Sequence, residues 1–379
     1  MEAKKINVDV NQFPTLTYNW LNINRTHLNA EVGGECEPAA LKTPEGISLK
    51  KEEPSLFYSD DGNSKDLSDK NLQELLQKQT GLGKPFDTQF NEIVLENKIS
   101  VSKYFVSKDK KISEPVRISF SPKDRTTSAC DQIIIAEKNS ESTFIMDYSN
   151  AENSTGLFGV RTRIYAEENA VVHIVKVNLL GKDFTHFDSI GTVLSDNAKV
   201  EVTQIELGAK SNYTGTYNCL EGRKSSCLGH VGYVATENQT LDINYVAHQT
   251  GKETASQMNV NGVLDKKAQK VWRGTIDFVK GAKNSTGDEK EEVLLLSPEV
   301  VNKTLPVILC DEEDVEGHHG ASIGRLDSDI LFYMQTRGID EKTAQEIMIK
   351  SKIYAVCRFI PDETLVQKIQ NYIEGMFVR

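Results

Sequence analysis

Residues 168–174 read ENAVVHI and residues 196–202 read DNAKVEV, and this pair of stretches decides the predicted fold. In both, an asparagine is followed by apolar residues at every second position, which is the period of a strand with one buried face. The match continues to Leu179 in the first stretch and to Leu207 in the second, and residues 238–243 fit the same pattern. Polar turns that alternate with such strands are typical of a solenoid of stacked strands.

Short alternating runs of this kind extend from about residue 93 to residue 309. Clusters of Asn, Asp, Gly and Lys separate them, and no long run with helical spacing interrupts them. This pattern argues against a sheet built from strand–helix–strand units. The pattern favours a right-handed parallel β-helix over a β-sandwich, with about 25 residues in each coil.

Helical spacing marks the two segments that flank this β body. Before it, Leu72, Leu75 and Leu76 predict a helix that starts near Ser68 and ends near Gly81. After it we expect three short amphipathic helices, which open at Asp327 or Ser328, at Asp340 and at Pro361. The predicted domains are an N-terminal mixed or helical segment, a β-helix core and a C-terminal helical domain for partner docking, over residues 1–92, 93–322 and 323–379.

The charge and composition of the chain narrow its class of partner and its compartment. With 44 Lys and Arg against 55 Asp and Glu, the formal net charge is −11. This charge repels polyanions and excludes nucleic acid and an anionic membrane as main partners. No window is long and apolar enough to span a membrane, and the N-terminus lacks the apolar core of a signal peptide. We therefore expect a cytoplasmic chain whose six cysteines are reduced thiols.

The most specific motif lies where the β body meets the helical tail, within residues 310–338. Its parts follow in a fixed order, at Asp314-Val315, His319-Gly320-Ala321, Ile323-Gly324-Arg325-Leu326-Asp327, Leu331-Phe332-Tyr333 and Arg337-Gly338. This order resembles the SufD family, whose members are scaffold subunits of the iron–sulfur cluster assembly complex. The paralogous SufB family carries EHEA and SK where this chain has HHGA and GR. Residues 16–21, which read LTYNWL, also resemble a SufD N-terminus.

The resemblance implies the same β-helix fold and a non-catalytic scaffold that works with two other chains. A SufB-like paralogue would pair with the β-helix, and a SufC-like ABC ATPase would dock on the helical tail. The chain on its own would form a homodimer. The residues expected to dock the ATPase are Leu331, Phe332, Tyr333, Arg337 and Ile347.

His318 and His319 are the adjacent histidines of the motif. Neighbouring residues on a strand point to opposite faces, so the two imidazoles are not expected to hold one metal ion together. The resemblance implies that His319 faces the SufB partner and helps to build the nascent cluster, which makes it the candidate metal ligand. The SufD family often has cysteine at the position of Gly317, and thiolates are the main ligands of iron–sulfur clusters. We therefore expect no tightly bound cofactor on the isolated chain, and a nascent cluster at the interface with SufB.

Other polar side chains fit weaker patterns. Cys219, Cys227 and His230 form C-x7-C-x2-H, whose spacing matches no standard zinc site. His248 aligns with Leu207 in the repeat and is expected to pack inward.

The sequence also departs from the family and leaves two alternatives open. Residues 288–292 read DEKEE, where the SufD family commonly carries glutamine and asparagine. A phosphate-binding loop and a G-x-S-x-G nucleophile elbow are both missing, so an ATPase must be another chain. One alternative is a β-helix carbohydrate-active enzyme, a class that is usually secreted. The other is a SufB-like subunit that holds the nascent cluster itself, against which Gly317 argues.

Overall fold

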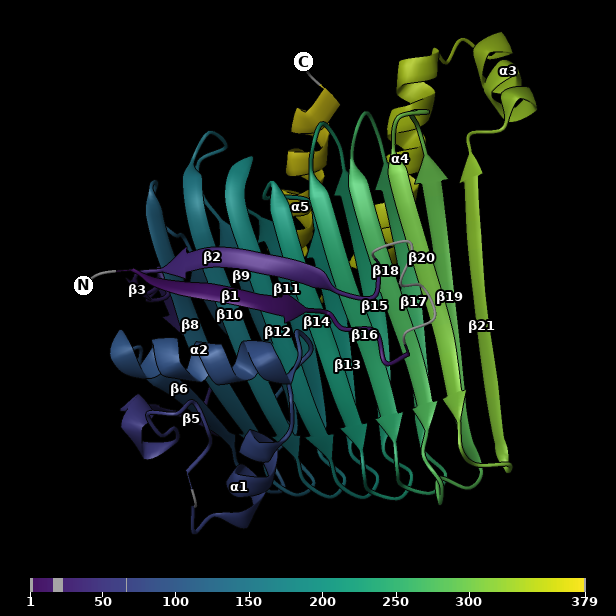
Figure 1. Ribbon diagram of the computed structural model, residues 1–379. Coiled ribbons are helices and arrows are strands. Elements are labelled where there is room, and N and C mark those ends of the chain that lie inside the picture. The colour runs from purple at the N-terminus through teal and green to yellow at the C-terminus, as the bar shows by residue number, and fades with distance from the viewer. Residues whose placement is uncertain (1–2, 16–22, 66, 378–379) are drawn as a thin grey trace.

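Two facing sheets wind together as a parallel solenoid in a computed structural model that describes residues 3–15, 23–65 and 67–377 (Figure 1). Over this part of the chain, the sheet that we call sheet B has 10 strands in the order β20-β18-β16-β14-β12-β10-β8-β6-β5, with β3 beside β8. The facing sheet C has nine, in the order β21-β19-β17-β15-β13-β11-β9-β7-β4. Strands that follow each other along the solenoid alternate between the two sheets, so each coil adds one strand to each.

The predicted fold class, a mainly β solenoid with a helical tail, is confirmed. The strands are β1 Lys4–Val10, β2 Thr26–Val32, β3 Gly34–Glu35, β4 Ala40–Lys42, β5 Ile47–Glu52, β6 Val101–Val106, β7 Val116–Phe120, β8 Thr126–Ala136, β9 Glu141–Ser149, β10 Thr155–Ala166, β11 Val171–Leu179, β12 Asp183–Leu194, β13 Lys199–Glu206, β14 Ser211–Leu220, β15 Ser226–Ala235, β16 Thr240–Gln249, β17 Ala255–Leu264, β18 Gln269–Phe278, β19 Ser285–Leu295, β20 Val301–Cys310 and β21 Val315–Arg325. The helices are η2 Pro54–Leu56, α1 Lys70–Gln77, α2 Lys84–Glu96, α3 Ser328–Thr336, α4 Glu341–Cys357 and α5 Glu363–Phe377.

The alignment of the two repeated stretches is confirmed by the pairing of β11 with β13, in which Val171 lies beside Lys199. Residues 238–243 were expected to take the same position in the coil as the other two stretches, and this expectation was wrong. Leu241 lies in β16, which pairs with β14 in sheet B, whereas the other two stretches belong to sheet C. Apolar and polar residues alternate in the same way along the strands of both sheets. A shift of about one and a half coils, which leads from sheet C to sheet B, therefore gives an equally good sequence match.

The asparagines of the repeat sit at sharp turns between coils. Asn139, Asn169 and Asn197 have φ of 59°, 59° and 56°, in the left-handed region that asparagine tolerates better than most residues. Paired residues lie 26 positions apart at Thr185 and Ser211 and 32 apart at Gln269 and Val301, so the coils are longer than the expected length of about 25 residues.

The N-terminal segment covers one end of the solenoid, which we call the closed end. There β5 pairs with β6 and β4 pairs with β7, both antiparallel, and α1 and α2 lie on the outer face of sheet B (Figure 1). The predicted helix exists as α1, but it ends at Gln77 and not near Gly81. Gly81 instead touches the backbone of Gly215, because a Cβ built on it would lie 1.8 Å from the Gly215 carbonyl carbon. The helix α2 was not expected.

A buried ion-pair network holds this segment on sheet B. Arg161 donates from Nη2 and Nε to the two oxygens of Asp131, at 2.7 and 2.9 Å, and from Nη1 to Asn91 of α2 at 2.7 Å. The Tyr58 hydroxyl also donates to Asp131, at 2.7 Å. Burial alone would raise the pKa of Asp131, but the guanidinium of Arg161 outweighs it and holds that pKa below its usual value.

The hairpin of β1 and β2 crosses the outer face of sheet B from the closed end toward the last coils (Figure 1). At its far end Asn11 donates to Asp242 of β16 at 2.6 Å, and Arg273 of β18 donates to the same carboxylate at 2.6 Å. Arg273 also donates to the Ile23 carbonyl at 2.9 Å. The hairpin thus ties early and late coils together. The motif-like residues 16–21 lie outside the described residues.

The helical tail begins as predicted, with Asp327 and Asp340 capping α3 and α4. The third helix, α5, begins at Glu363, and Asp362 rather than Pro361 accepts from the Leu365 N–H, at 3.0 Å. Helices α4 and α5 pack their apolar residues on the outer face of sheet C.

Candidate interface at the open end of the solenoid

The last coil leaves two strands without a neighbour on their outer side in the part of the chain that the structure describes. These strands are β20 in sheet B and β21 in sheet C, and we call this end the open end. Val301 and Ile323 are large apolar residues that stay exposed there. Unpaired N–H and C=O groups along such strands are a template for pairing with another chain.

The two histidines of the motif lie on β21, on opposite faces of sheet C. His318 pairs with Asp288 of β19 and His319 pairs with Glu289. Asp288 is exposed, while Glu289 is buried inside the solenoid. Because neighbours in a ladder share a face, His319 belongs to the interior face and His318 to the outer one.

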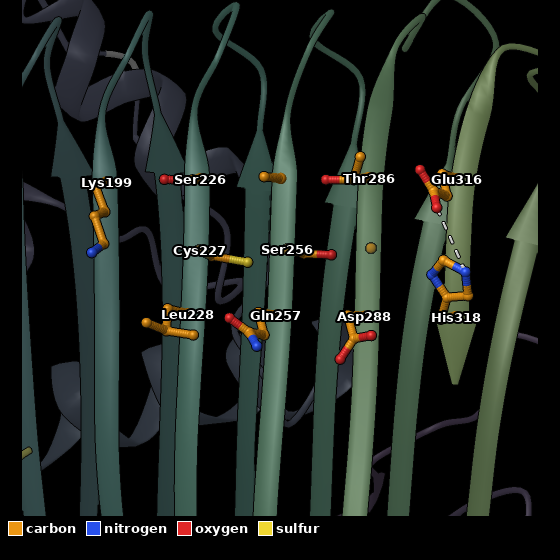
Figure 2. A pocket seen from close by; sticks show the side chains of 12 residues that line it. Lys199, Ser226, Cys227, Leu228, Ser256, Gln257, Thr286, Asp288, Glu316 and His318 are labelled. Carbon is orange, nitrogen blue, oxygen red and sulfur yellow. Dashed lines mark ion pairs between the residues drawn. The ribbon is translucent and has the colours of Figure 1, made fainter. Parts of the chain in front are cut away.

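The outer face at His318 is a shallow groove, shown in Figure 2. The groove has a volume of about 450 Å³, and Nε2 of His318 lies 3.7 Å from a carboxylate oxygen of Glu316. It is lined across successive strands of sheet C, from Lys199 to Gln257 and Asp288. His318 therefore faces solvent on a surface that is separate from the interior.

The interior beneath His319 contains a buried polar cluster. Trp272 donates from Nε1 to Glu289 Oε1 at 2.6 Å, and Lys270 donates to Glu291 at 2.5 Å. Thr304 of β20 donates to the other oxygen of Glu291 at 2.7 Å. Burial raises the pKa of Glu289 to about 7.

This cluster accounts for the unusual stretch of residues 288–292. Alternation along β19 places Glu289 and Glu291 inside, while Lys290 and Glu292 face outward. Glu292 accepts from Lys352 of α4 at 2.6 Å, so the outward half of the stretch holds the tail on sheet C. The inward half lines the mouth of the interior.

The tail residues expected to dock a partner lie on α3, just after it and on α4, and most of them are exposed. Phe332 and Tyr333 are 67% and 59% exposed, and α3 has no buried residue. Ile347 and Arg337 are exposed and Leu331 is half-buried, with the Arg337 guanidinium 5.3 Å from the centre of the Tyr333 ring. Exposed apolar side chains that gather on one helix are typical of a surface for protein–protein contact.

The weaker candidates do not come together. Cys219 lies on the outer face of sheet B, under the N-terminal segment, while Cys227 packs inside the solenoid. His230 stacks on Phe359 of the tail, 3.6 Å between ring centres, on the outer face of sheet C. Across the described residues no three His, Cys, Asp or Glu side chains gather closely enough to hold a metal ion.

The expectation that His248 packs inward was wrong. His248 is half-buried on the outer face of sheet B, and its Nδ1 lies 2.6 Å from Asp277. Its neighbour Ala247 takes the interior position. The alignment with Leu207 did not support an inward position, because Leu207 itself lies on the outer face of sheet C, under α4 and α5.

Sequence reasoning missed the cluster of Glu289, Glu291, Lys270 and Trp272. Acidic residues at alternate positions of a strand resemble a solvent-exposed face. Their partners Lys270 and Trp272 lie on β18, and only the folded coil brings that strand opposite β19. A signal that could have found it is the K-x-W pattern at residues 270–272. Lys270 and Trp272 are two positions apart, as Glu289 and Glu291 are, so each pair lies on one face of its strand.

Comparison with known proteins gives consistent results. A family model described as "SUF system FeS cluster assembly, SufBD core domain" matches residues 120–352. The iron-sulfur cluster assembly protein SufD of Bacillus subtilis is 24% identical over 286 residues, which are 71% of this chain and 62% of that protein. SufD of Escherichia coli is 25% identical over 236 residues, 61% of this chain and 55% of that protein. The chain thus spans less than two thirds of the length of these relatives.

Proposed function

The chain belongs to the SufBD family of the SUF system for iron–sulfur cluster assembly, and from this premise we propose that it is a non-catalytic scaffold subunit. It pairs with a SufB-like paralogue through the open end and docks a SufC-like ABC ATPase through its tail. Alone, it pairs with a second copy of itself. The observation that carries the proposal is the contrast between a first coil that the N-terminal segment covers and a last coil whose edge strands have no outer neighbour among the described residues.

Pairing favours the edge of sheet C. The strand β21 has 11 residues without a proline, so its outer edge offers a full set of donors and acceptors. The strand β20 carries Pro306, which has no N–H and weakens any ladder at that position. A partner strand therefore adds beside β21, next to His319.

His319 then supplies a nitrogen to the iron that is being assembled, as cargo, at this interface. Gly317 faces the interior on the same strand, since a Cβ built on it would meet Phe278 and Ile308 side chains at 3.0 and 3.1 Å. No sulfur stands at that position, so the thiolates come from the partner. The isolated chain keeps no tightly bound cofactor.

The proposal places the complex in the cytoplasm, where thiols stay reduced. In support, all six cysteines are free, and only Cys310 is exposed. No helix of the described ranges is long and apolar enough to cross a membrane.

Co-expression of the tagged chain with a SufB-like and a SufC-like protein tests the assembly. Both are expected to co-purify, and Phe332→Ala or Ile347→Asp should release the ATPase but not the paralogue. Leu56→Asp is the matched control, because Leu56 is also an exposed apolar residue but lies at the closed end. Full ATPase retention in both tail variants contradicts the docking surface.

Anaerobic reconstitution and activity assays test the scaffold role. The complex should hold a cluster and the isolated chain should not, and His319→Ala should lower the cluster yield more than His318→Ala. The purified chain should neither hydrolyse ATP nor cleave acidic polysaccharide. A stable cluster on the isolated chain points to the SufB-like alternative, and turnover that survives repurification points to an enzyme.

A further inference from the structure

We propose that Glu289 is a second iron donor of this chain, so that His319 and Glu289 together offer one nitrogen and one oxygen to ferrous iron at the open end. This inference rests on the proposed function, because it concerns the same interface. It assigns a role to a buried carboxylate that family resemblance left without one.

The first observation is an unused oxygen. Three glutamates are buried in the interior of the described chain, and two of them have both oxygens paired. Glu206 accepts from Gln204 and Asn178 at 2.7 and 2.8 Å, and Glu291 accepts from Lys270 and Thr304. Glu289 accepts from Trp272 through Oε1, but its Oε2 has no hydrogen-bond partner although the residue is only 2% exposed. A buried oxygen in this state is costly unless something binds it.

The second observation is the position of that glutamate. In the ladder between β19 and β21, Glu289 is the partner of His319, while Glu291 is the partner of Ala321. Only Glu289 therefore has a metal-binding side chain as its neighbour on the interior face of the outermost strand. Gly274 on the opposite sheet leaves the space for the carboxylate, since a Cβ there would lie 2.0 Å from Glu289 Oε1.

The chemistry of the pair fits a divalent cation of intermediate softness. An imidazole nitrogen and a carboxylate oxygen are both good ligands of ferrous iron. The nearby charges of Lys270 and Glu291 cancel each other, which leaves an ionised Glu289 as the uncompensated charge of the cluster. No third donor gathers here within the described residues, so this chain fills two positions of the metal, and water or a partner fills the others.

The test is a Co²⁺ titration of the full-length chain, followed by visible absorption and equilibrium dialysis. The wild type should bind one equivalent, and Glu289→Gln and His319→Ala should each weaken the Kd at least tenfold. Trp272→Phe removes the donor that fixes the carboxylate and should weaken the Kd by a smaller factor. Glu206→Gln changes another buried glutamate and His318→Ala another histidine, and both should leave the Kd unchanged.

Two results would overturn the inference: no Co²⁺ binding by the wild type, or a Kd that Glu289→Gln and Trp272→Phe leave unchanged. The proposed function is tested separately by co-purification. If the complex forms but Glu289→Gln binds Co²⁺ as tightly as the wild type, only this inference is wrong. Loss of Co²⁺ binding in Glu289→Gln without any complex formation removes only the proposed function.

Discussion

At the closed end the outermost strands are β4, three residues long, and β5, which carries Lys50 and Lys51; at the open end they are β20 and β21, with 10 and 11 residues. Short strands and lysines on an edge discourage pairing with another chain, whereas long strands that expose Val301 and Ile323 invite it. The coils are built alike, so the difference lies in what covers them. One end is covered within the chain, whereas among the described residues the other keeps two strands without an outer neighbour, and there we propose that a partner pairs.

The largest expected effect comes from breaking the closed end with Arg161→Met. The substitution leaves the buried Asp131 without its bidentate partner and with only Arg163, 3.8 Å away, which should cost about 3–5 kcal/mol of unfolding free energy. Urea denaturation measures this loss, and Arg125→Met is the control because its side chain is 86% exposed. Equal stability of the two variants would show that the N-terminal segment is not held by this network.

Next comes Glu206, an interior carboxylate on β13, whose pKa burial raises to about 7 from an ordinary value of 4.5. Between these two pH values the folded state binds a proton that the unfolded state has released, so stability falls as pH rises through this window. Glu206→Gln removes this dependence. The difference in unfolding free energy between variant and wild type should shift in favour of the variant by on the order of 2 kcal/mol from pH 5 to pH 7.

Denaturation curves of both proteins at a series of pH values give this difference directly. Glu289→Gln should show a shift of the same sign, since burial raises the pKa of Glu289 in the same way. A difference that stays constant with pH would mean that Glu206 is ionised in the folded protein throughout.

A smaller effect, on the affinity for the paralogue, is expected when lysines like those on β5 are introduced at the open end. Val301→Lys together with Ile323→Lys should weaken pairing with the paralogue at least tenfold, or about 1.4 kcal/mol. Both residues are exposed, so the unfolding free energy should change by less than about 1 kcal/mol. Sedimentation of the mixed chains reports the pairing, and unchanged association would place the interface elsewhere.

The smallest effect on stability is expected from Gly317→Cys, which restores a sulfur beside His319. The new side chain needs only small movements of Phe278 and Ile308. Co²⁺ added to this variant should give an intense sulfur-to-metal absorption band that the wild type lacks, because thiolate and imidazole then share one face of β21. Gly320→Cys is the control, since residue 320 has the opposite parity, and an equal band there would contradict the assignment of faces.

Much of the fold could be read from the sequence, because alternation and capping are local. The asparagine turns, the strands and the caps at Asp327 and Asp340 depend on residues a few positions apart. The coil register depends on neighbours 26 to 32 residues away, and Leu241 was placed in the wrong sheet for that reason. His248 was assigned wrongly because Leu207, with which it aligns, is buried under the tail and not inside the solenoid.

The candidate site followed the same division. The opposite faces of His318 and His319 follow from strand alternation alone. That Glu289 lies under His319 could not be predicted, since it needs the ladder between β19 and β21. The glutamates of β19 can point inward because Trp272 and Lys270 donate to them, and these donors belong to another strand.

The hairpin of β1 and β2 changes how the coils come apart. A stack of coils with contacts only between neighbours can open rung by rung from its free end. Here Asn11 donates to Asp242, and Arg273 donates to the Ile23 carbonyl. Unfolding that reaches β18 must therefore also detach the N-terminal hairpin. In hydrogen exchange, amides from β10 to β18 should therefore open in one cooperative event, while those of β21 should exchange early and independently. Such loosely held final coils would let β21, the strand proposed to bind the partner, adjust without unfolding the coils behind it.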